Sequence, residues 1–320
     1  MRLRTIPSIF LATLLGVLLL IPNIALAGDK VEVVVSFDAT KGQLPEGVAE
    51  DKSGNVYVDF ISPVSELRKI APDGTQTVVT DFPTGGLGPL GLAVDAPGNV
   101  YVCLTTFDPS TGGIYRVSRD GTSVRLPGTE ALQFCNGLAF DKLGNLYATD
   151  SIGGAVWKIP PGGSAQEWIQ DPLLEGNGAF GMAFPIGANG ITFASHSLVV
   201  DNSEKASLMR IPIRVDGSAG TPQIIAEGPA LFGSDGITLD VFGRPYVAVI
   251  AQNKIVRVSG GSVTTLVDAS DGIVGASSLV FGTGRGDRLS LYAVNFGIFS
   301  AVPEPALLRI PIGVPGRPVP

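Results

Sequence analysis

The chain has 320 residues, 45% of them hydrophobic and 16% charged, and its 42 glycines and 24 prolines make about a fifth of it turn-forming. That composition is too apolar for a disordered chain and too rich in turn residues for a protein of long helices. The formal net charge of −7 argues against nucleic acid as a partner, because phosphates are bound by basic surfaces. We therefore expect an acidic all-β protein.

Residues 1–27 have the pattern of a signal peptide. Arg2 and Arg4 form a basic start, an apolar run covers 9–20, and Ala25-Leu26-Ala27 supplies the small residues that signal peptidase recognises. The alternative is a membrane anchor, but the apolar run is short for a span of about 20 residues. No cysteine directly follows the cleavage pattern. We expect cleavage after Ala27 and a secreted or periplasmic protein that is not attached to a membrane.

A segment of about 13 residues recurs along the rest of the chain. Its clearest copies read EGVAEDKSGNVYV from Glu46, LGLAVDAPGNVYV from Leu90, NGLAFDKLGNLYA from Asn136 and DGITLDVFGRPYV from Asp235. Looser copies begin at 189 and 277. The small residue in second place falls at 47, 91, 137, 190, 236 and 278, so the repeats are 42 to 53 residues apart.

Each copy predicts a strand, a glycine turn and a second strand. A third strand follows, as at 66–70, 113–117 and 155–159, and then a fourth, as at 76–80. Four antiparallel strands in about 45 residues are typical of one blade of a β-propeller. The last unit has three recognisable strands, while 31–37 is a strand without an assigned partner. We expect residues 28–320 to form a single domain, a six-bladed β-propeller closed by pairing of the N-terminal strand into the last blade.

The residue before each repeat glycine is expected at one mouth of the central channel, because the first strand of every blade lines that channel. These residues are Glu46, Leu90, Asn136, Asn189, Asp235 and Ser277. The ends of the antiparallel second strands bring Asp59, Asp150, Asp201, Asn202 and Asn295 to the same mouth. Converging carboxylate and amide oxygens without a His or Cys cluster suit Ca²⁺. The alternative is that these residues only cap turns.

The motifs Pro-Glu-Gly at 45–47, Asn-Gly-Leu at 136–138, Asn-Gly-Ile at 189–191 and Asp-Gly-Ile at 235–237 resemble the senescence-marker-protein/gluconolactonase family. The similarity extends through essentially the whole chain after the leader. It implies that Glu46, Asn189 and Asp235 hold a divalent metal, Ca²⁺ or another, and that Asn136 occupies the substrate-binding or fourth position. It also implies hydrolysis of a lactone or related ester.

In that interpretation the cation polarises the substrate carbonyl, and Asp235 and Asn136 are the catalytic residues, with Asp235 as general base. We expect a small-molecule substrate and a monomer. Two alternatives remain open: a strictosidine-synthase-like condensing or cyclising enzyme, which shares the six-bladed ring, and a non-catalytic propeller that binds a ligand or a protein.

The fourth blade has two possible frames. A second Asn-Gly pair lies at Asn177, but the frame from Asn189 is preferred because 197–202 then follows as the second strand. Segment 171–188 becomes a loop that can overhang the channel mouth. His196, the single histidine, then falls in a turn at the opposite mouth, where we expect a surface residue.

The remaining candidates are two cysteines and a set of tyrosines. Cys103 and Cys135 are expected near the same mouth on adjacent blades, where they form either a disulfide, which export favours, or two buried thiols. The tyrosines at 57, 101, 147, 246 and 292 recur at one repeat position, so we expect them to pack in the core or between blades.

Overall fold

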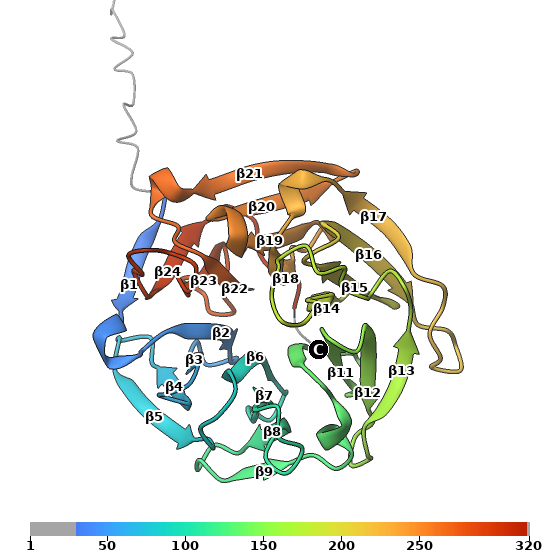
Figure 1. Ribbon diagram of the computed structural model, residues 1–320. Coiled ribbons are helices and arrows are strands. Elements are labelled where there is room, and N and C mark those ends of the chain that lie inside the picture. The colour runs from blue at the N-terminus through green and yellow to red at the C-terminus, as the bar shows by residue number, and fades with distance from the viewer. Residues whose placement is uncertain (1–29, 319–320) are drawn as a thin grey trace, which may run out of the picture.

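Residues 30–318 are described by the computed structural model, and they form a ring of six four-stranded antiparallel sheets around a central channel (Figure 1). Within each blade the strands are hydrogen-bonded in order from the channel outward. The innermost strands of neighbouring blades contact one another all the way around. The predicted six-bladed β-propeller is confirmed.

The strand bounds follow the repeat. Blade one holds β2 (Pro45–Glu50), β3 (Val56–Phe60), β4 (Glu66–Ile70) and β5 (Gln76–Asp81). Blade two holds β6 (Gly88–Val94), β7 (Val100–Thr105), β8 (Gly113–Val117) and β9 (Ser123–Arg125). Blade three holds β10 (Cys135–Phe140), β11 (Leu146–Asp150), β12 (Ala155–Ile159) and β13 (Gln166–Gln170).

The second half of the ring is built in the same way. Blade four holds β14 (Ala188–Phe193), β15 (Ser197–Asn202), β16 (Ser207–Pro212) and β17 (Gln223–Glu227). Blade five holds β18 (Ser234–Leu239), β19 (Pro245–Val249), β20 (Lys254–Ser259) and β21 (Ser262–Asp268). Blade six holds β22 (Ala276–Phe281), β23 (Ser290–Asn295) and β24 (Ala306–Pro311). Short 3-10 helices lie at η1 (Ala39–Lys41), η2 (Thr129–Ala131), η3 (Pro229–Leu231), η4 (Ile250–Gln252) and η5 (Ala269–Asp271).

The ring is closed by β1 (Glu32–Ser36), which supplies the fourth strand of blade six. It pairs antiparallel with β24, from Glu32 opposite Arg309 to Ser36 opposite Ala306. The next residue, Phe37, packs edge-on against Phe60 of blade one with 4.8 Å between ring centroids. The predicted closure is therefore confirmed, and it also ties the last blade to the first.

The first turn of a blade is held by an aspartate that the repeat carries. In blade three Asp141 accepts hydrogen bonds from the Asn145 side chain at 2.7 Å and from the Tyr147 hydroxyl at 3.3 Å. The same set recurs in blades one and two, and Arg244 takes the place of the asparagine in blade five. The recurring tyrosines thus anchor the turn as well as filling the core.

The far end of the channel is crossed by residues 312–318. Val241 donates its amide to the Pro315 carbonyl at 3.1 Å, and Arg317 donates its amide to the Leu239 carbonyl at 2.8 Å. Arg317 and Pro318 line a cavity of about 140 Å³ in the apolar lower channel.

The predicted signal peptide, 1–27, lies outside the described residues. Within 30–318 there is no helix of the length and apolar character needed to cross a bilayer.

Candidate functional site

The repeat glycines bring the predicted site residues together. A methyl group on Gly137 would lie 2.6 Å from the Asn189 carbonyl oxygen of the next blade, closer than real contacts allow. At the other four repeat glycines an added methyl would also meet the backbone carbonyl of the next blade's site residue: Gly47 against Leu90, Gly91 against Asn136, Gly190 against Asp235, and Gly236 against Ser277. Because each glycine directly follows one site residue and touches the next, the site residues form a tight ring.

Hydroxyl groups fix the spacing of that ring. The Thr149 hydroxyl donates to the Asn189 carbonyl at 2.5 Å, and the Ser277 hydroxyl donates to the Glu46 carbonyl at 2.7 Å. Comparable bonds run from Thr105 to Cys135, from Ser151 to Ala188 and from Ser203 to Ser234. Together these hydroxyl groups hold the backbone at the mouth at four of the six junctions between blades: six to one, two to three, three to four and four to five.

Four predicted site residues line one pocket of about 120 Å³ at this mouth: Glu46, Asn136, Asn189 and Asp235. All four are buried. The Asn189 side-chain amide donates to the Ser203 hydroxyl at 3.0 Å, and Asn136 donates likewise to Ser151 at 3.3 Å. Within residues 30–318, neither Asn189 Oδ1 nor Glu46 Oε2 has a hydrogen-bond partner. The pocket floor therefore offers unsatisfied oxygen atoms.

The two carboxyl groups of this set strongly resist ionisation. Burial raises the pKa of Glu46 well above its usual value, and repulsion from Asp235 and Asp59 raises it further. Burial also raises the pKa of Asp235, although a hydrogen bond from the Asn189 side chain opposes the shift. A positive charge in the pocket would lower both pKa values by stabilising the carboxylates.

Two further carboxylates lie behind the ring. Asp59 accepts the Gly47 amide at 2.7 Å, and Asp201 accepts the Gly190 amide at 3.2 Å. Both are wholly buried, and burial raises both pKa values. Their place in the site was only loosely predicted from the ends of the second strands. The sharper signal is their position, 11 or 12 residues after a repeat glycine.

The other polar residues predicted at strand ends hold loops instead. Asp150 accepts the amides of Gln133 and Phe134 at 2.9 and 3.0 Å. Asn202 donates to carbonyls at 173 and 175, and Asn295 donates to that of Gly272. For these three residues the turn-capping alternative is the better description.

The donor set fits a hard cation, although it is not an all-carboxylate cluster. Residues 30–318 contain no group of three or more His, Cys, Asp or Glu side chains placed to hold a metal ion. The predicted set differs from such a group because it combines the carboxylates of Glu46 and Asp235 with the amide oxygen of Asn189. Oxygen donors of this mixed kind are those that Ca²⁺ uses, and two of them, Glu46 Oε2 and Asn189 Oδ1, are buried without a partner.

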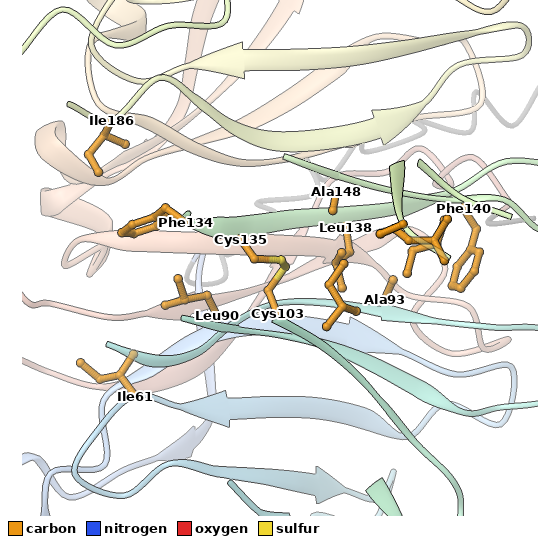
Figure 2. Packing of buried hydrophobic residues seen from close by; sticks show 14 of the residues in the cluster. Ile61, Leu90, Ala93, Cys103, Phe134, Cys135, Leu138, Phe140, Ala148 and Ile186 are labelled. Atoms are coloured by element: carbon orange, nitrogen blue, oxygen red, sulfur yellow. A yellow bond between two sulfur atoms is a disulfide. The ribbon is translucent and has the colours of Figure 1, made fainter. Parts of the chain in front are cut away.

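Cys103 and Cys135 form a disulfide between blades two and three, with their Cα atoms 5.4 Å apart. Figure 2 shows it beside Leu90 and Phe134, which line the pocket. It lies under the pocket wall and cross-links the two blades there.

Blade four begins at Asn189, as preferred from the sequence, because β14 spans Ala188–Phe193. Asn177 lies in the preceding loop, where its amide donates to the Glu204 carboxylate at 2.6 Å. That loop does reach the mouth, since Phe180 and Met182 line the pocket. His196 is exposed in the turn after β14.

Neither the protein-family models nor the curated proteins include a match to this chain. Solved structures do match. A gluconolactonase from Xanthomonas campestris is 18% identical, with a TM-score of 0.64 over 90% of this chain and 89% of that one. A calcium-binding protein, regucalcin, from Agrobacterium tumefaciens is 17% identical, with a TM-score of 0.65 over 90% and 95%.

A virginiamycin B lyase from Staphylococcus aureus is 17% identical, with a TM-score of 0.58 over 82% of this chain and 85% of that one. At such identities these likenesses show the fold, a six-bladed β-propeller. Because the named neighbours include a gluconolactonase, a calcium-binding protein and a lyase, the choice of chemistry rests on the residues at the mouth.

Proposed function

We propose that the protein is a divalent-metal-dependent hydrolase of a lactone or related ester, and that the metal is Ca²⁺. The observation that carries the proposal is the meeting of Glu46, Asn189, Asp235 and Asn136 in one pocket, with buried oxygens that lack partners. The gluconolactonase and regucalcin neighbours support it.

In this proposal Glu46, Asp235 and Asn189 Oδ1 hold the cation. When bound, the cation would polarise the substrate carbonyl and stabilise the negative charge that develops on its oxygen. The second carboxylate oxygen of Asp235 accepts a proton from the attacking water. The side-chain amide of Asn136 donates one hydrogen bond to the Ser151 hydroxyl, which leaves its second hydrogen to donate to the substrate.

Metal binding is the first test. We expect Ca²⁺ at about 100 times its dissociation constant to stabilise the protein by about 2.7 kcal/mol, seen as a higher melting temperature. Glu46→Gln and Asp235→Asn remove the negative charge at nearly constant shape and should abolish the rise. Glu167→Gln, on the exposed face of β13, is the matched control. An unchanged calcium response in both site variants would contradict the ligand assignment.

Turnover is the second test. A panel of lactones and esters, assayed with and without a chelator, should show hydrolysis that is lost on chelation and restored by Ca²⁺. Calcium binding without turnover of any lactone or ester would favour the non-catalytic alternative.

We further propose that the protein is exported and acts as a monomer on a small molecule. The support is the leader pattern at 1–27 and the Cys103–Cys135 disulfide, which suits an oxidising compartment. The N-terminus of the protein recovered from the periplasm or medium should be Gly28. A protein retained in the cytoplasm with its leader intact would contradict export.

A further inference from the structure

The walls above the polar floor of the pocket are apolar, and every blade contributes to them. We call the six buried residues that form this wall the apolar collar: Ile61, Leu90, Phe134, Ile186, Ile250 and Phe296. They come one from each blade in ring order, at the end of the blade that carries the site. Figure 2 shows Ile61, Leu90, Phe134 and Ile186 along that end.

The rim outside the collar is apolar as well. Met182, Ile298 and Phe299 line the pocket from two loops and remain between 40% and 62% exposed. Phe107 stacks in a tilted trio with Phe134 and Phe184, with centroids 5.5 to 5.9 Å apart. An apolar surface of this kind, exposed around a pocket mouth, is typical of a binding site.

Phe107 carries a second sign of function. Its backbone lies in the left-handed region at φ 59°, although a bulky side chain is disfavoured there, and its ring is about half exposed. Strained residues of this kind concentrate at binding and active sites. The ring packs against Phe134 of the apolar collar, beside the pocket.

The pocket has no basic side chain. Its only charged lining residues are Glu46 and Asp235, and its polar groups are confined to the floor. No cationic side chain of residues 30–318 lines the pocket to bind the charged group of an anionic substrate, and the apolar collar would remove water from that group at a large cost. A polyhydroxylated lactone would leave its hydroxyl groups against aliphatic carbon, at a cost of about 1–3 kcal/mol for each unpaired group.

We propose, on the basis of the function proposed above, that the substrate is an uncharged lactone or ester with an alkyl or aryl substituent. The ester group meets Glu46, Asn189 and Asp235, and the substituent lies in the apolar collar. Water adds to the acyl carbon, the acyl C–O bond breaks, and the leaving oxygen receives the proton that Asp235 took from the water. The product is a hydroxy acid from a lactone, or a carboxylic acid and an alcohol from an ester.

A homologous series of γ-lactones tests this proposal, with gluconolactone and a carboxylate-bearing lactone for comparison. Burial of each added methylene should raise kcat/KM by about three- to fourfold until the collar is filled. Leu90→Asn should flatten this dependence, whereas the matched change Leu143→Asn, at a fully exposed turn, should leave it intact. Equal or better turnover of gluconolactone or the anionic lactone would overturn the inference while leaving the hydrolase proposal standing.

A binding measurement separates the two proposals. Calorimetry with alkyl-substituted tetrahydrofurans, which contain no ester to hydrolyse, should show affinity that rises with chain length and a negative heat-capacity change. Phe299→Ser at the exposed rim should lower the affinity for the longest ligand without affecting folding. Phe242→Ser, on an exposed turn elsewhere, should leave that affinity unchanged. Chain-length-dependent binding without any lactone turnover would refute hydrolysis but support an apolar ligand. Affinity independent of chain length would refute the inference.

Discussion

At the scale of single residues, the site depends on the absence of side chains as much as on their presence. Asn136 and Asn189 approach each other because Gly137, which lies between them in space, has no Cβ to clash with the Asn189 carbonyl oxygen. The repeat in the sequence places this glycine in the first strand of a blade but does not indicate how closely the neighbouring strand approaches it. Its function in the fold is to let two channel-lining strands come close.

Gly137→Ala should therefore disturb both the fold and the site. The added methyl lies 2.6 Å from the Asn189 oxygen and 3.1 Å from Ile191, so we expect a loss of about 1–3 kcal/mol in urea unfolding and weaker calcium binding. Gly286→Ala is the control, because no atom lies within 4 Å of the methyl position. Equal stability of the two variants would show that the inner strands can move apart.

Glu50 makes a pH-dependent contribution at the seam between blades one and six. It is buried and accepts the Thr283 amide at 2.7 Å, and burial, with repulsion from Asp287, raises its pKa to about 8. The folded state therefore binds this proton more tightly than the unfolded state does. The associated stability is present at low pH and is lost as the pH rises from about 4.5 to about 8.

Glu50→Gln should remove that dependence. We expect the variant to gain on the order of 2 kcal/mol relative to the parent between pH 5 and pH 9, because the amide needs no proton. Melting temperatures measured across this range, with Glu167→Gln alongside, provide the check. Parallel curves for the parent and Glu50→Gln would show that this carboxyl does not titrate as the structure implies.

At the scale of elements, most of the fold could be predicted because its signal is repeated. The Asp-x-x-Gly-Asn-x-Tyr segment specifies two strands and their turn, and its recurrence places the residue before each first glycine on one ring. Asp59 and Asp201 were harder to place, because the length of the second strand decides which residue reaches the channel. The loops at 171–187 and 296–305 have no counterpart in the repeat, so the sequence predicted that the first of them can overhang the mouth but not which side chains of either loop line the pocket.

β1 is the element whose loss should have the widest effect. Truncation through Ser36 leaves β24 as an open edge and removes four residue pairs, which we estimate at about 3 kcal/mol. The truncated protein should melt earlier and associate, as measured by light scattering. A protein truncated only through residue 29 is the control. A stable, monomeric protein without β1 would mean that closure is not needed.

At the scale of the whole molecule, the disulfide cross-links two neighbouring blades beneath the site. It closes a loop of 32 residues, so replacing both Cys103 and Cys135 by Ser should cost about 3–4 kcal/mol. Reductant should lower the melting temperature of the parent but not of the double variant. Equal melting temperatures for the oxidised parent and the double variant would show that the bond adds nothing.

The sequence left the state of these cysteines open, because pairing depends on a Cα separation that spacing along the chain does not determine. It also contained no sign that residues 312–318 cross the far end of the channel. Both features join segments that the repeat does not relate to each other. A repeat cannot predict them, because they occur once.

The pairing of Glu32 with Arg309 joins residues near opposite ends of the chain, so it has a kinetic consequence. Bringing these ends together from an unfolded chain costs about 5 kcal/mol of entropy for a loop of roughly 280 residues. The cost falls steeply once the intervening blades have stacked, because the two strands are then already close. We expect β1 to pair with β24 last during refolding. The rate of this final refolding phase should therefore fall when any blade of the ring is destabilised.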